Sequence, residues 1–308
     1  MIIALVGPTA VGKTKLSLEL AQEFNAEIVC VDSVVVYRDF NIGTAKPTIE
    51  EQKKVPHYCI DVTSPADLFT AYDFCEAATR AIEKIQKKNK NVFLVGGSGL
   101  YFKALTQGMF QAPPSDPKIR EGLEERLSQD PKALYEELCL VDLKTSQAIH
   151  PNDHYRILRA LEVYHMTGKS FSQYQEDHAQ NKKKDFGIKD LIKIGLNMDR
   201  PLLYQNIEQR TAHMLKEGLI EEVQELQKKY PLECKPFQSV GYKETLQFLS
   251  MDSPIKSGND GLKELSERIN QATRQLAKGQ MTWFRADPQI QWFLPSDPAI
   301  HHKIAKLL

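Results

Sequence analysis

The chain reads Gly7-Pro8-Thr9-Ala10-Val11-Gly12-Lys13-Thr14 near its amino terminus, which fits the pattern G-x-x-x-x-G-K-[ST] of a phosphate-binding loop. The apolar run Ile2–Val6 before it predicts a buried strand, and Leu16, Leu20 and Phe24 recur after it at helical spacing. In a strand-loop-helix context, the loop N–H groups and the helix N-terminus favour an anion. The motif therefore predicts a di- or triphosphate ligand, with Lys13 neutralising it and the Thr14 hydroxyl holding Mg²⁺.

Strands and helices alternate after this loop. A second strand is predicted at 27–31 and ends at Asp32-Ser33, a helix follows at about 71–86, and a strand at 91–95 ends at Gly96-Gly97-Ser98-Gly99. Such alternation is typical of an α/β fold whose parallel sheet carries helices on both faces. Ligands bind at the carboxyl ends of such strands, so we expect these three strand ends to form one site.

A helical segment interrupts the α/β pattern. It follows a proline-rich loop at 112–117, runs with helical periodicity to about 167, and ends at a polar break at 181–185 before a strand at 191–196. Helices are then predicted at about 201–216, 219–230, 242–249 and 261–284, with a short last strand at 290–294. We therefore expect a P-loop NTPase-like core at 1–115 and 186–308, and a mainly helical insertion domain at 116–185.

Composition limits the partners of this 308-residue chain. Its 40 Lys and Arg balance 40 Asp and Glu, so only a local basic patch could bind a polyanion. The five cysteines form no C-x-x-C pair, which indicates neither a zinc site nor a disulfide framework. No apolar run is long enough for a membrane span, and the amino terminus enters a strand directly. We expect a cytoplasmic protein that binds no membrane.

The loop alone leaves the chemistry open. Many P-loop NTPases hold Mg²⁺ with an acid at a strand end, but the strand at 91–95 ends in Gly-Gly, and no guanine-reading Asn-Lys-x-Asp motif is present. Asp32 is the acid that ends an early strand, and it could bind a metal ion or act as a base toward an acceptor. A small-molecule kinase is therefore the main alternative from the loop alone.

Basic residues gather on two predicted helices. Arg156 and Arg159 lie opposite the apolar face of the helix at about 153–167. In the late helix, Arg274, Lys278 and Arg285 share a face beside two aromatic residues. Basic faces with neighbouring aromatic rings are typical of RNA binding, although solvated ion pairs would give the same pattern.

Segments along almost the whole chain together resemble the bacterial tRNA dimethylallyltransferases, also called tRNA isopentenyl transferases. The matching segments are Gly7–Thr14, Asp32–Tyr37, Ile42–Pro47, Pro56–Asp61, Val95–Tyr101, His150–Asp153 with Arg156, Arg159 and Ala160–Tyr164, Gly218–Ile220, Val240–Glu244 and Gln280–Arg285.

The resemblance implies a specific reaction. The loop would bind the diphosphate of dimethylallyl diphosphate through Gly7, Thr9, Ala10, Val11, Gly12, Lys13 and Thr14. The dimethylallyl group would pass to N6 of adenosine 37, beside the anticodon, in tRNAs that read codons beginning with U. Asp32 would act as general base, while Lys13 and Arg210 would stabilise the leaving diphosphate and Ser98 would contact its bridging region. Mg²⁺ near Thr14 is the implied cofactor, and we expect a monomer.

The expected RNA contacts combine this resemblance with the two basic helices. They are Asp32, Ser33, Val34, Val35, Ser98, Arg120, Tyr155, Arg156, Ile157, Leu158, Arg159, Gln238, Gly241, Tyr242, Lys243, Arg274, Lys278 and Arg285. Four positions depart from the family pattern. Val35 stands where Gln is frequent, Asn206 where Arg is common, and Leu276 and Gly279 replace a frequent Tyr and Arg. A prenyltransferase acting on free AMP and a catalytically weak RNA-binding relative are the remaining alternatives.

Overall fold

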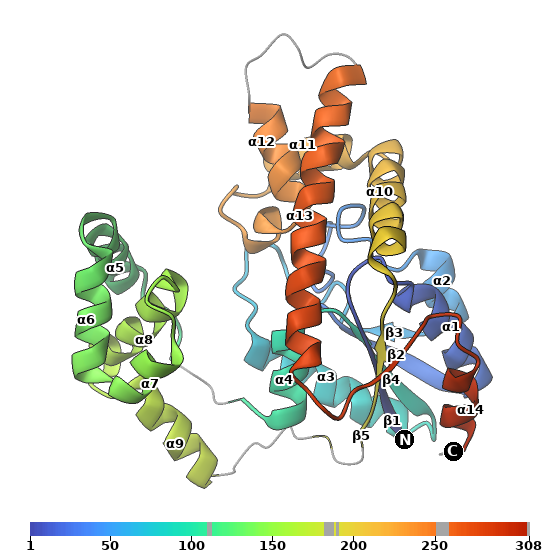
Figure 1. Ribbon diagram of the computed structural model, residues 1–308, viewed down its shortest axis with the longest axis horizontal. Helices are drawn as coiled ribbons and strands as arrows, with labels where there is room; N and C mark the ends of the chain where they lie inside the picture. Colours follow the sequence, from blue (N-terminus) through green and yellow to red (C-terminus); the bar gives the residue numbers. More distant parts are fainter. Residues whose placement is uncertain (110–112, 182–187, 189–190, 251–258, 307–308) are drawn as a thin grey trace. The chain divides into compact units, whose positions relative to one another are not determined.

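The computed structural model describes residues 1–109, 113–181, 188, 191–250 and 259–306. The chain folds into two compact units (Figure 1). The core unit comprises Met1–Gln107 and Phe186–Leu308, and the helical unit comprises Gly108–Asp185. The helical unit thus begins eight residues before the boundary expected at 116, and Ser115 and the N–H of Asp116 bind Glu162 within this unit.

A six-stranded, wholly parallel sheet with strand order β3-β2-β4-β1-β5-β6 forms the centre of the core unit. Val6 and Val31 both pair with Gly96. The ends of β1, β2 and β4 are therefore neighbours, as predicted, and they lead into the phosphate-binding loop, Asp32 and Gly97 respectively. The strands are β1 (Ile2–Val6), β2 (Ala26–Val31), β3 (His57–Tyr58), β4 (Asn91–Gly96), β5 (Leu191–Leu196) and β6 (Gln291–Phe293).

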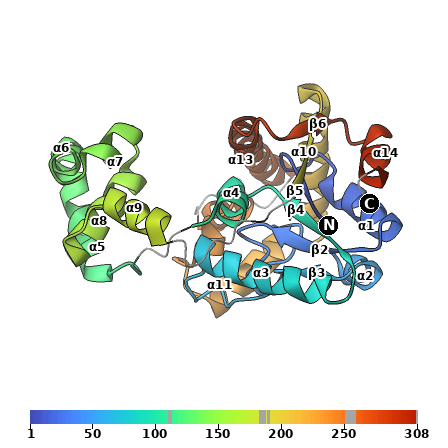
Figure 2. The ribbon, with the colours of Figure 1, turned by 90° about the horizontal axis from the view of Figure 1, so that it is seen from below.

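Helices cover both faces of this sheet (Figure 2). Helices α1 (Lys13–Glu23) and α14 (Ala299–Ala305) share a hydrophobic core with Ile3 and Leu5 of β1. Helix α3 (Ala71–Gln86) packs on β2 and β4 from the other side and contacts α4 (Gly99–Gln107). The short α2 (Ile49–Lys54) lies against α1. This is the doubly covered α/β arrangement that the strand-helix alternation predicts.

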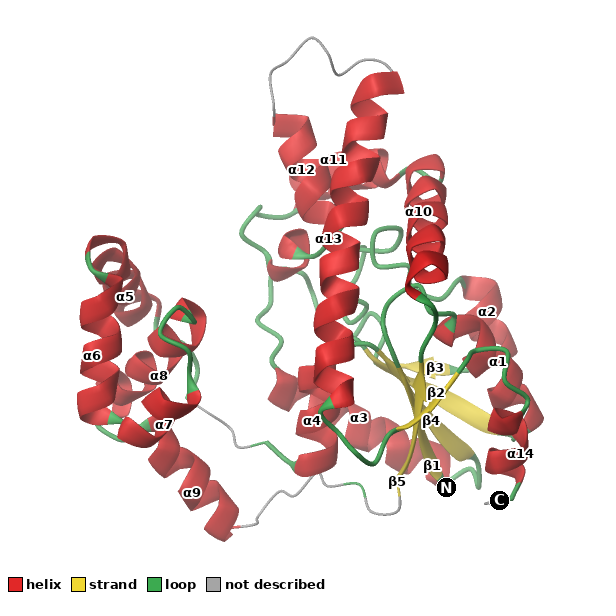
Figure 3. Ribbon diagram, viewed as in Figure 1, coloured by secondary structure: helices red, strands yellow, loops and turns green. Residues whose placement is uncertain are grey.

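The later helices of the core unit form a second hydrophobic cluster around Phe40, Phe237 and Tyr242. They are α10 (Arg200–Lys216), α11 (Leu219–Lys229), α12 (Tyr242–Ser250) and α13 (Asn259–Arg285), with a 3₁₀ turn at Lys235–Gln238. Helix α13 packs along α10 (Figure 3). Both helices contribute side chains to the cavity beside the phosphate-binding loop, which makes this pair part of the site.

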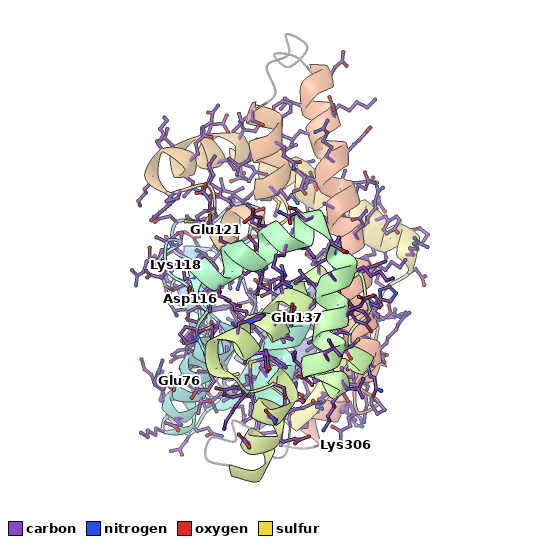
Figure 4. The ribbon with its side chains drawn as sticks, turned by 90° about the vertical axis from the view of Figure 1, so that its left-hand side faces the viewer. Glu76, Asp116, Lys118, Glu121, Glu137 and Lys306 are labelled. Atoms are coloured by element: carbon purple, nitrogen blue, oxygen red, sulfur yellow. The ribbon has the colours of Figure 1, made fainter. Side chains whose placement is uncertain are left out.

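The helical unit has its own hydrophobic core, which includes Leu123, Leu134, Leu138 and Leu161. Its helices are α5 (Pro117–Gln129), α6 (Pro131–Val141), α7 (Leu143–Ala148), α8 (His154–Thr167) and α9 (Phe171–Asn181). Asp116, labelled in Figure 4, accepts hydrogen bonds from the backbone N–H groups at the start of α5, as an N-cap residue does. Glu137, also labelled, pairs with both Arg126 and His165.

Six elements of the described structure lie outside the sequence predictions. The strand β3, the helices α2 and α14 and the 3₁₀ turn at Lys235–Gln238 are too short to show a periodic pattern. Helices α4 and α9 were also not predicted. The break expected at 181–185 lies almost wholly outside the described residues, as does the first residue of the loop expected at 112–117. Within the described ranges, none of the helices combines the length and apolar character required of a membrane span.

Candidate active site

The phosphate-binding loop joins β1 to α1. Gly12 has φ +99°, a left-handed conformation that L-amino acids other than glycine rarely adopt, and α1 begins at the next residue. The loop therefore turns sharply into the helix and presents its N–H groups at the helix N-terminus, where an anion is favoured.

Lys13 folds back over this loop. Its Nζ atom donates hydrogen bonds to the carbonyl oxygens of Gly7 (2.9 Å) and Pro8 (2.7 Å). Burial and the positive charge of Arg210 lower the pKa of Lys13 to about 7, although the carboxylate of Asp32 acts in the opposite direction. A bound polyphosphate would restore the charged form, so Lys13 lies where an anionic ligand changes its protonation state.

Arg210 reaches the same cavity from α10. Burial lowers the pKa of its guanidinium, and the negative charge of Asp32 opposes this effect. Because arginine keeps its proton in proteins, Arg210 remains a cation. Two basic side chains and one carboxylate thus interact electrostatically around one cavity.

Asp32 is held by the turn that follows β2. Its Oδ1 atom accepts hydrogen bonds from the backbone N–H groups of Val34 (2.8 Å) and Val35 (3.4 Å). No hydrogen bond to the Oδ2 atom is formed by the described residues, and Asp32 lines the cavity. One oxygen therefore fixes the carboxylate, while the other remains able to accept a proton.

Ser98 joins the ends of β4 and β2. Its hydroxyl oxygen accepts a hydrogen bond from the backbone N–H of Ser33 at 2.9 Å and lies 3.3 Å from the Ser33 hydroxyl oxygen. Ser98 therefore braces the residue next to Asp32.

The cavity beside the loop has a volume of about 480 Å³. Polar groups of the loop, Asp32 and Arg210 line part of it, while apolar side chains from both sheet and helices line the rest. The apolar residues of the strands and helices include Ile28, Cys30, Val95, Met214, Ile269 and Leu276. The cavity can therefore hold an anionic group together with an apolar one.

The segment 41–45 contributes to the cavity through Gly43, Thr44 and Ala45, which the sequence analysis did not predict. Backbone N–H groups of Asn41, Ile42 and Gly43 donate to the carboxylate of Glu222. Tyr242 also donates to Glu222 and accepts from the Gly43 N–H at 3.1 Å. Glu222 and Tyr242 are 179 to 199 residues from these partners in sequence, so no local pattern indicates this arrangement.

Tyr242, expected to contact RNA, is fully buried in the second cluster. Its aromatic side chain is structural, because it packs on Phe40 and its hydroxyl is paired with Glu222. Its neighbours differ: Gln238 and Lys243 are exposed, and Gly241 lines the cavity. Any RNA contact of this segment therefore involves Gln238, Lys243 or the backbone.

The expected RNA contacts of the helical unit also divide by burial. Tyr155 is 71% exposed, and the Arg120 guanidinium lies 5.6 Å from its ring centroid. Arg156 is exposed, whereas Ile157 and Leu158 are buried in the core of the unit. A contact of this segment with RNA therefore depends on Arg120, Tyr155 and Arg156.

Arg159 occupies a different environment on the same helix. It pairs with the fully buried carboxylate of Glu162 at 2.9 Å and also donates to the carbonyl oxygen of Pro113. Glu162 in turn accepts from Ser115 and from the N–H of Asp116. Arg159 thus stabilises the entry into the helical unit through a buried ion pair.

The basic residues on α13 are likewise unequal. Arg274 pairs with Glu208 at 2.6 Å and lies over the ring of Tyr204. Lys278 and Arg285 are exposed, as is Trp283 at 40%. Lys278, Arg285 and Trp283 therefore form the accessible part of the basic face on α13.

Magnesium is compatible with the loop. The described residues contain no group of three His, Cys, Asp or Glu side chains that could hold a metal ion. Mg²⁺ needs only one or two protein ligands when a phosphate and water supply the rest. The Thr14 hydroxyl is exposed at the cavity and meets this requirement.

The parallel sheet and its loop define the class of P-loop α/β proteins, here with a cavity that places a carboxylate near two basic side chains. Within this class the chain belongs to the IPP transferase family, because the model of that family matches residues 35–287. The chain is 43% identical to tRNA dimethylallyltransferase 1 of Trichlorobacter lovleyi, over 99% of this chain and 97% of that protein.

Two solved structures are similar over nearly the whole chain. The full-length tRNA isopentenylpyrophosphate transferase of Bacillus halodurans matches with a TM-score of 0.67 and 36% identity, covering 99% of this chain and 93% of the other. A eukaryotic dimethylallyltransferase acting on tRNA matches with a TM-score of 0.75 and 29% identity, covering 97% of this chain and 74% of the other. The family resemblance drawn from the sequence motifs is thereby confirmed.

Proposed function

We propose that this protein transfers the dimethylallyl group of dimethylallyl diphosphate to N6 of adenosine 37, beside the anticodon of tRNAs reading codons that begin with U. The products are N6-isopentenyladenosine and diphosphate. The family membership and the names of its relatives support this reaction. One observation carries the proposal: Asp32, Lys13 and Arg210 line one cavity with the phosphate-binding loop.

The donor would bind through its diphosphate. The loop N–H groups, Lys13 and Arg210 offer the positive charge that a departing diphosphate requires. The apolar part of the cavity suits a five-carbon prenyl group, which gains free energy by leaving water. The C1–O bond breaks as diphosphate leaves, and its electron pair stays with the diphosphate.

The acceptor would be an unstacked adenine. Unstacking a base costs a few kcal/mol, which RNA contacts outside the cavity must offset. The lone pair of N6 is delocalised into the purine ring, so attack on C1 is assisted by removal of the N6 proton. Asp32 accepts this proton, since its Oδ1 atom is already bound by the turn and its Oδ2 atom remains available.

Thr14 would hold Mg²⁺, which, when bound, offsets the negative charge of the diphosphate. The RNA contacts would come from the exposed groups described above, chiefly Tyr155, Arg156, Lys278 and Arg285. A tRNA substrate also implies that the protein works in the cytoplasm.

The proposal is tested by offering donors and acceptors in parallel. The protein and Mg²⁺ are incubated with dimethylallyl diphosphate plus an anticodon stem-loop, with dimethylallyl diphosphate plus AMP, and with ATP plus the same acceptors. We expect prenylation of the stem-loop. Prenylation of AMP but not of the stem-loop would show that the acceptor is a free nucleotide. Phosphoryl transfer from ATP would identify a kinase. RNA binding without turnover would identify a catalytically weak relative.

A further inference from the structure

Two side-chain amides from the later helices bind the backbone of the phosphate-binding loop. The backbone N–H of Thr9 donates to Oε1 of Gln280 at 2.7 Å, and Nδ2 of Asn206 donates to the carbonyl oxygen of Ala10 at 3.1 Å. Gln280 belongs to α13 and Asn206 to α10. Adjacent loop residues are therefore tied to two different helices, 271 and 196 residues away in sequence.

Ala10 needs such support. Its φ angle of +63° lies in the left-handed region, which is unfavourable for a residue with a Cβ atom. The Asn206 amide binds the carbonyl of this residue and thereby favours the conformation that Ala10 would otherwise leave.

Gln280 occupies a space that Gly97 leaves open. A Cβ atom built on Gly97 would lie 2.4 Å from Nε2 of Gln280, while its other neighbour outside that side chain, the Gly7 carbonyl oxygen, is 3.5 Å away. The backbone of Gly97 has no left-handed φ angle, so alanine there would be compatible with the backbone. An alanine at position 97 would therefore displace the end of the Gln280 side chain.

The two helices that supply the amides also supply the site. Arg210 follows Asn206 by one turn on α10, and Leu276 precedes Gln280 by one turn on α13. Helices α10 and α13 pack against one another. The two amides therefore fix the position of the loop relative to Arg210 and to Leu276, which both line the cavity.

We propose that Asn206 and Gln280 are positioning residues that clamp Thr9 and Ala10 in the conformation that binds diphosphate. The proposal rests on the proposed function only in taking diphosphate as the ligand of the loop. Without the clamp, the loop must be ordered by the ligand itself, so diphosphate affinity falls while the chemistry after binding is unchanged.

The test is a double-mutant cycle of Gln280→Ala and Gly97→Ala, with binding of inorganic diphosphate measured by calorimetry. Loss of one hydrogen bond predicts an increase in Kd of about 3- to 10-fold for Gln280→Ala. Gly97→Ala should weaken binding similarly, because it displaces Gln280. In the double variant the Gly97 change should add less than about twofold, since the group it displaces is gone.

A matched control and a second cycle complete the experiment. Gln275→Ala removes an exposed glutamine from the same helix and should leave Kd unchanged. Asn206→Ala should weaken binding, and Ala10→Gly should reduce that loss because glycine adopts the left-handed conformation freely. KM for dimethylallyl diphosphate should follow Kd in every variant, with kcat within about twofold of wild type for Gln280→Ala and Asn206→Ala.

Equal Kd values for wild type and Gln280→Ala, or fully additive losses for Gln280→Ala and Gly97→Ala, would overturn the clamp. A fall in melting temperature with unchanged Kd would show a purely structural role and would equally overturn it. Failure of the wild type to prenylate RNA would instead contradict the proposed function. It would leave the test of the clamp intact, since binding of inorganic diphosphate requires no prenyl transfer.

Discussion

The hydroxyl oxygen of Ser98 accepts a hydrogen bond from the backbone N–H of Ser33 at 2.9 Å. This contact joins two neighbouring strand ends beside Asp32, whose carboxylate in turn binds the N–H groups of Val34 and Val35. The turn that carries the proposed base is therefore held both by its own aspartate and by a hydroxyl from the residue that follows β4 and Gly97.

Ser98→Ala removes this brace and leaves the Ser33 N–H without its acceptor. We expect kcat for RNA prenylation to fall about 3- to 10-fold, as for loss of one hydrogen bond. Ser98→Thr keeps the hydroxyl and should stay within about twofold of wild type. Steady-state kinetics of the two variants measure this difference in kcat. Equal activity of the alanine and threonine variants would show that the hydroxyl has no such role.

Asp32→Asn keeps an oxygen for the Val34 N–H but removes the base. We expect kcat to fall about 100-fold or more, the usual contribution of general-base catalysis, while the Kd for diphosphate stays near that of wild type. Asp32→Ala should also lose turnover. Single-turnover prenylation and diphosphate calorimetry measure the two quantities separately. If Asp32→Asn weakened binding as much as turnover, the assignment as base would be wrong.

Diphosphate binding should take up a proton above neutral pH. The pKa of Lys13 is about 7 in the free protein, so at pH 8 most of its amine is neutral. A bound diphosphate raises that pKa, so binding at pH 8 should take up close to one proton and weaken by up to tenfold per pH unit above 7. Calorimetry with dimethylallyl diphosphate in buffers of different ionisation enthalpy measures this uptake.

Lys13→Arg is the control for this linkage, because a guanidinium keeps its proton throughout the range. The variant should bind without proton uptake. Wild-type binding without proton uptake at pH 8 would mean that Lys13 is already charged in the free protein.

Two arginines on α8 should have separable effects. Arg156 is exposed, so Arg156→Ala should weaken RNA binding and reduce its salt dependence with little change in stability. Arg159 pairs with buried Glu162, so Arg159→Ala leaves a buried charge unpaired and should destabilise the helical unit by about 3 kcal/mol. Filter binding at several salt concentrations and thermal unfolding measure the two effects. Reversal of this pattern would contradict the assignment.

Gly279 offers a gain-of-function test. It lies exposed on α13, and a Cβ atom added there meets nothing within 4 Å. Gly279→Ala should therefore stabilise the protein by about 0.5 to 1 kcal/mol through helix propensity. Gly279→Arg should add a cation beside Lys278 and also strengthen RNA binding. If the arginine variant bound RNA no better than the alanine variant, this face of α13 would not contact RNA.

Much of the core unit could be predicted from local patterns. The loop, the strand beginning at Ile2 and the long α3 each carry a signal within a single segment, and the strand-helix alternation predicts a parallel sheet. Elements such as His57–Tyr58 could not be found, because a two-residue strand exists only through its pairing with β2.

The arrangement around the site was harder to foresee. The contacts of Gln280 with Thr9, Asn206 with Ala10, and Glu222 with segment 41–43 join residues about 180 or more positions apart. Burial also separates residues that look alike in sequence, since Arg156 is exposed whereas Arg159 pairs with buried Glu162. Sequence motifs indicated the chemistry, but only the fold distinguishes the residues that face a ligand from those that hold the loops.

The position of the new carbon–nitrogen bond tests the central claim most directly. The protein is incubated with Mg²⁺, dimethylallyl diphosphate and a full tRNA that reads a codon beginning with U, and the RNA is digested to nucleosides for mass spectrometry. We expect N6-isopentenyladenosine from position 37 with one diphosphate released per modified base, and no product when position 37 is guanosine. Unmodified adenosine 37, with the dimethylallyl diphosphate recovered intact, would contradict it.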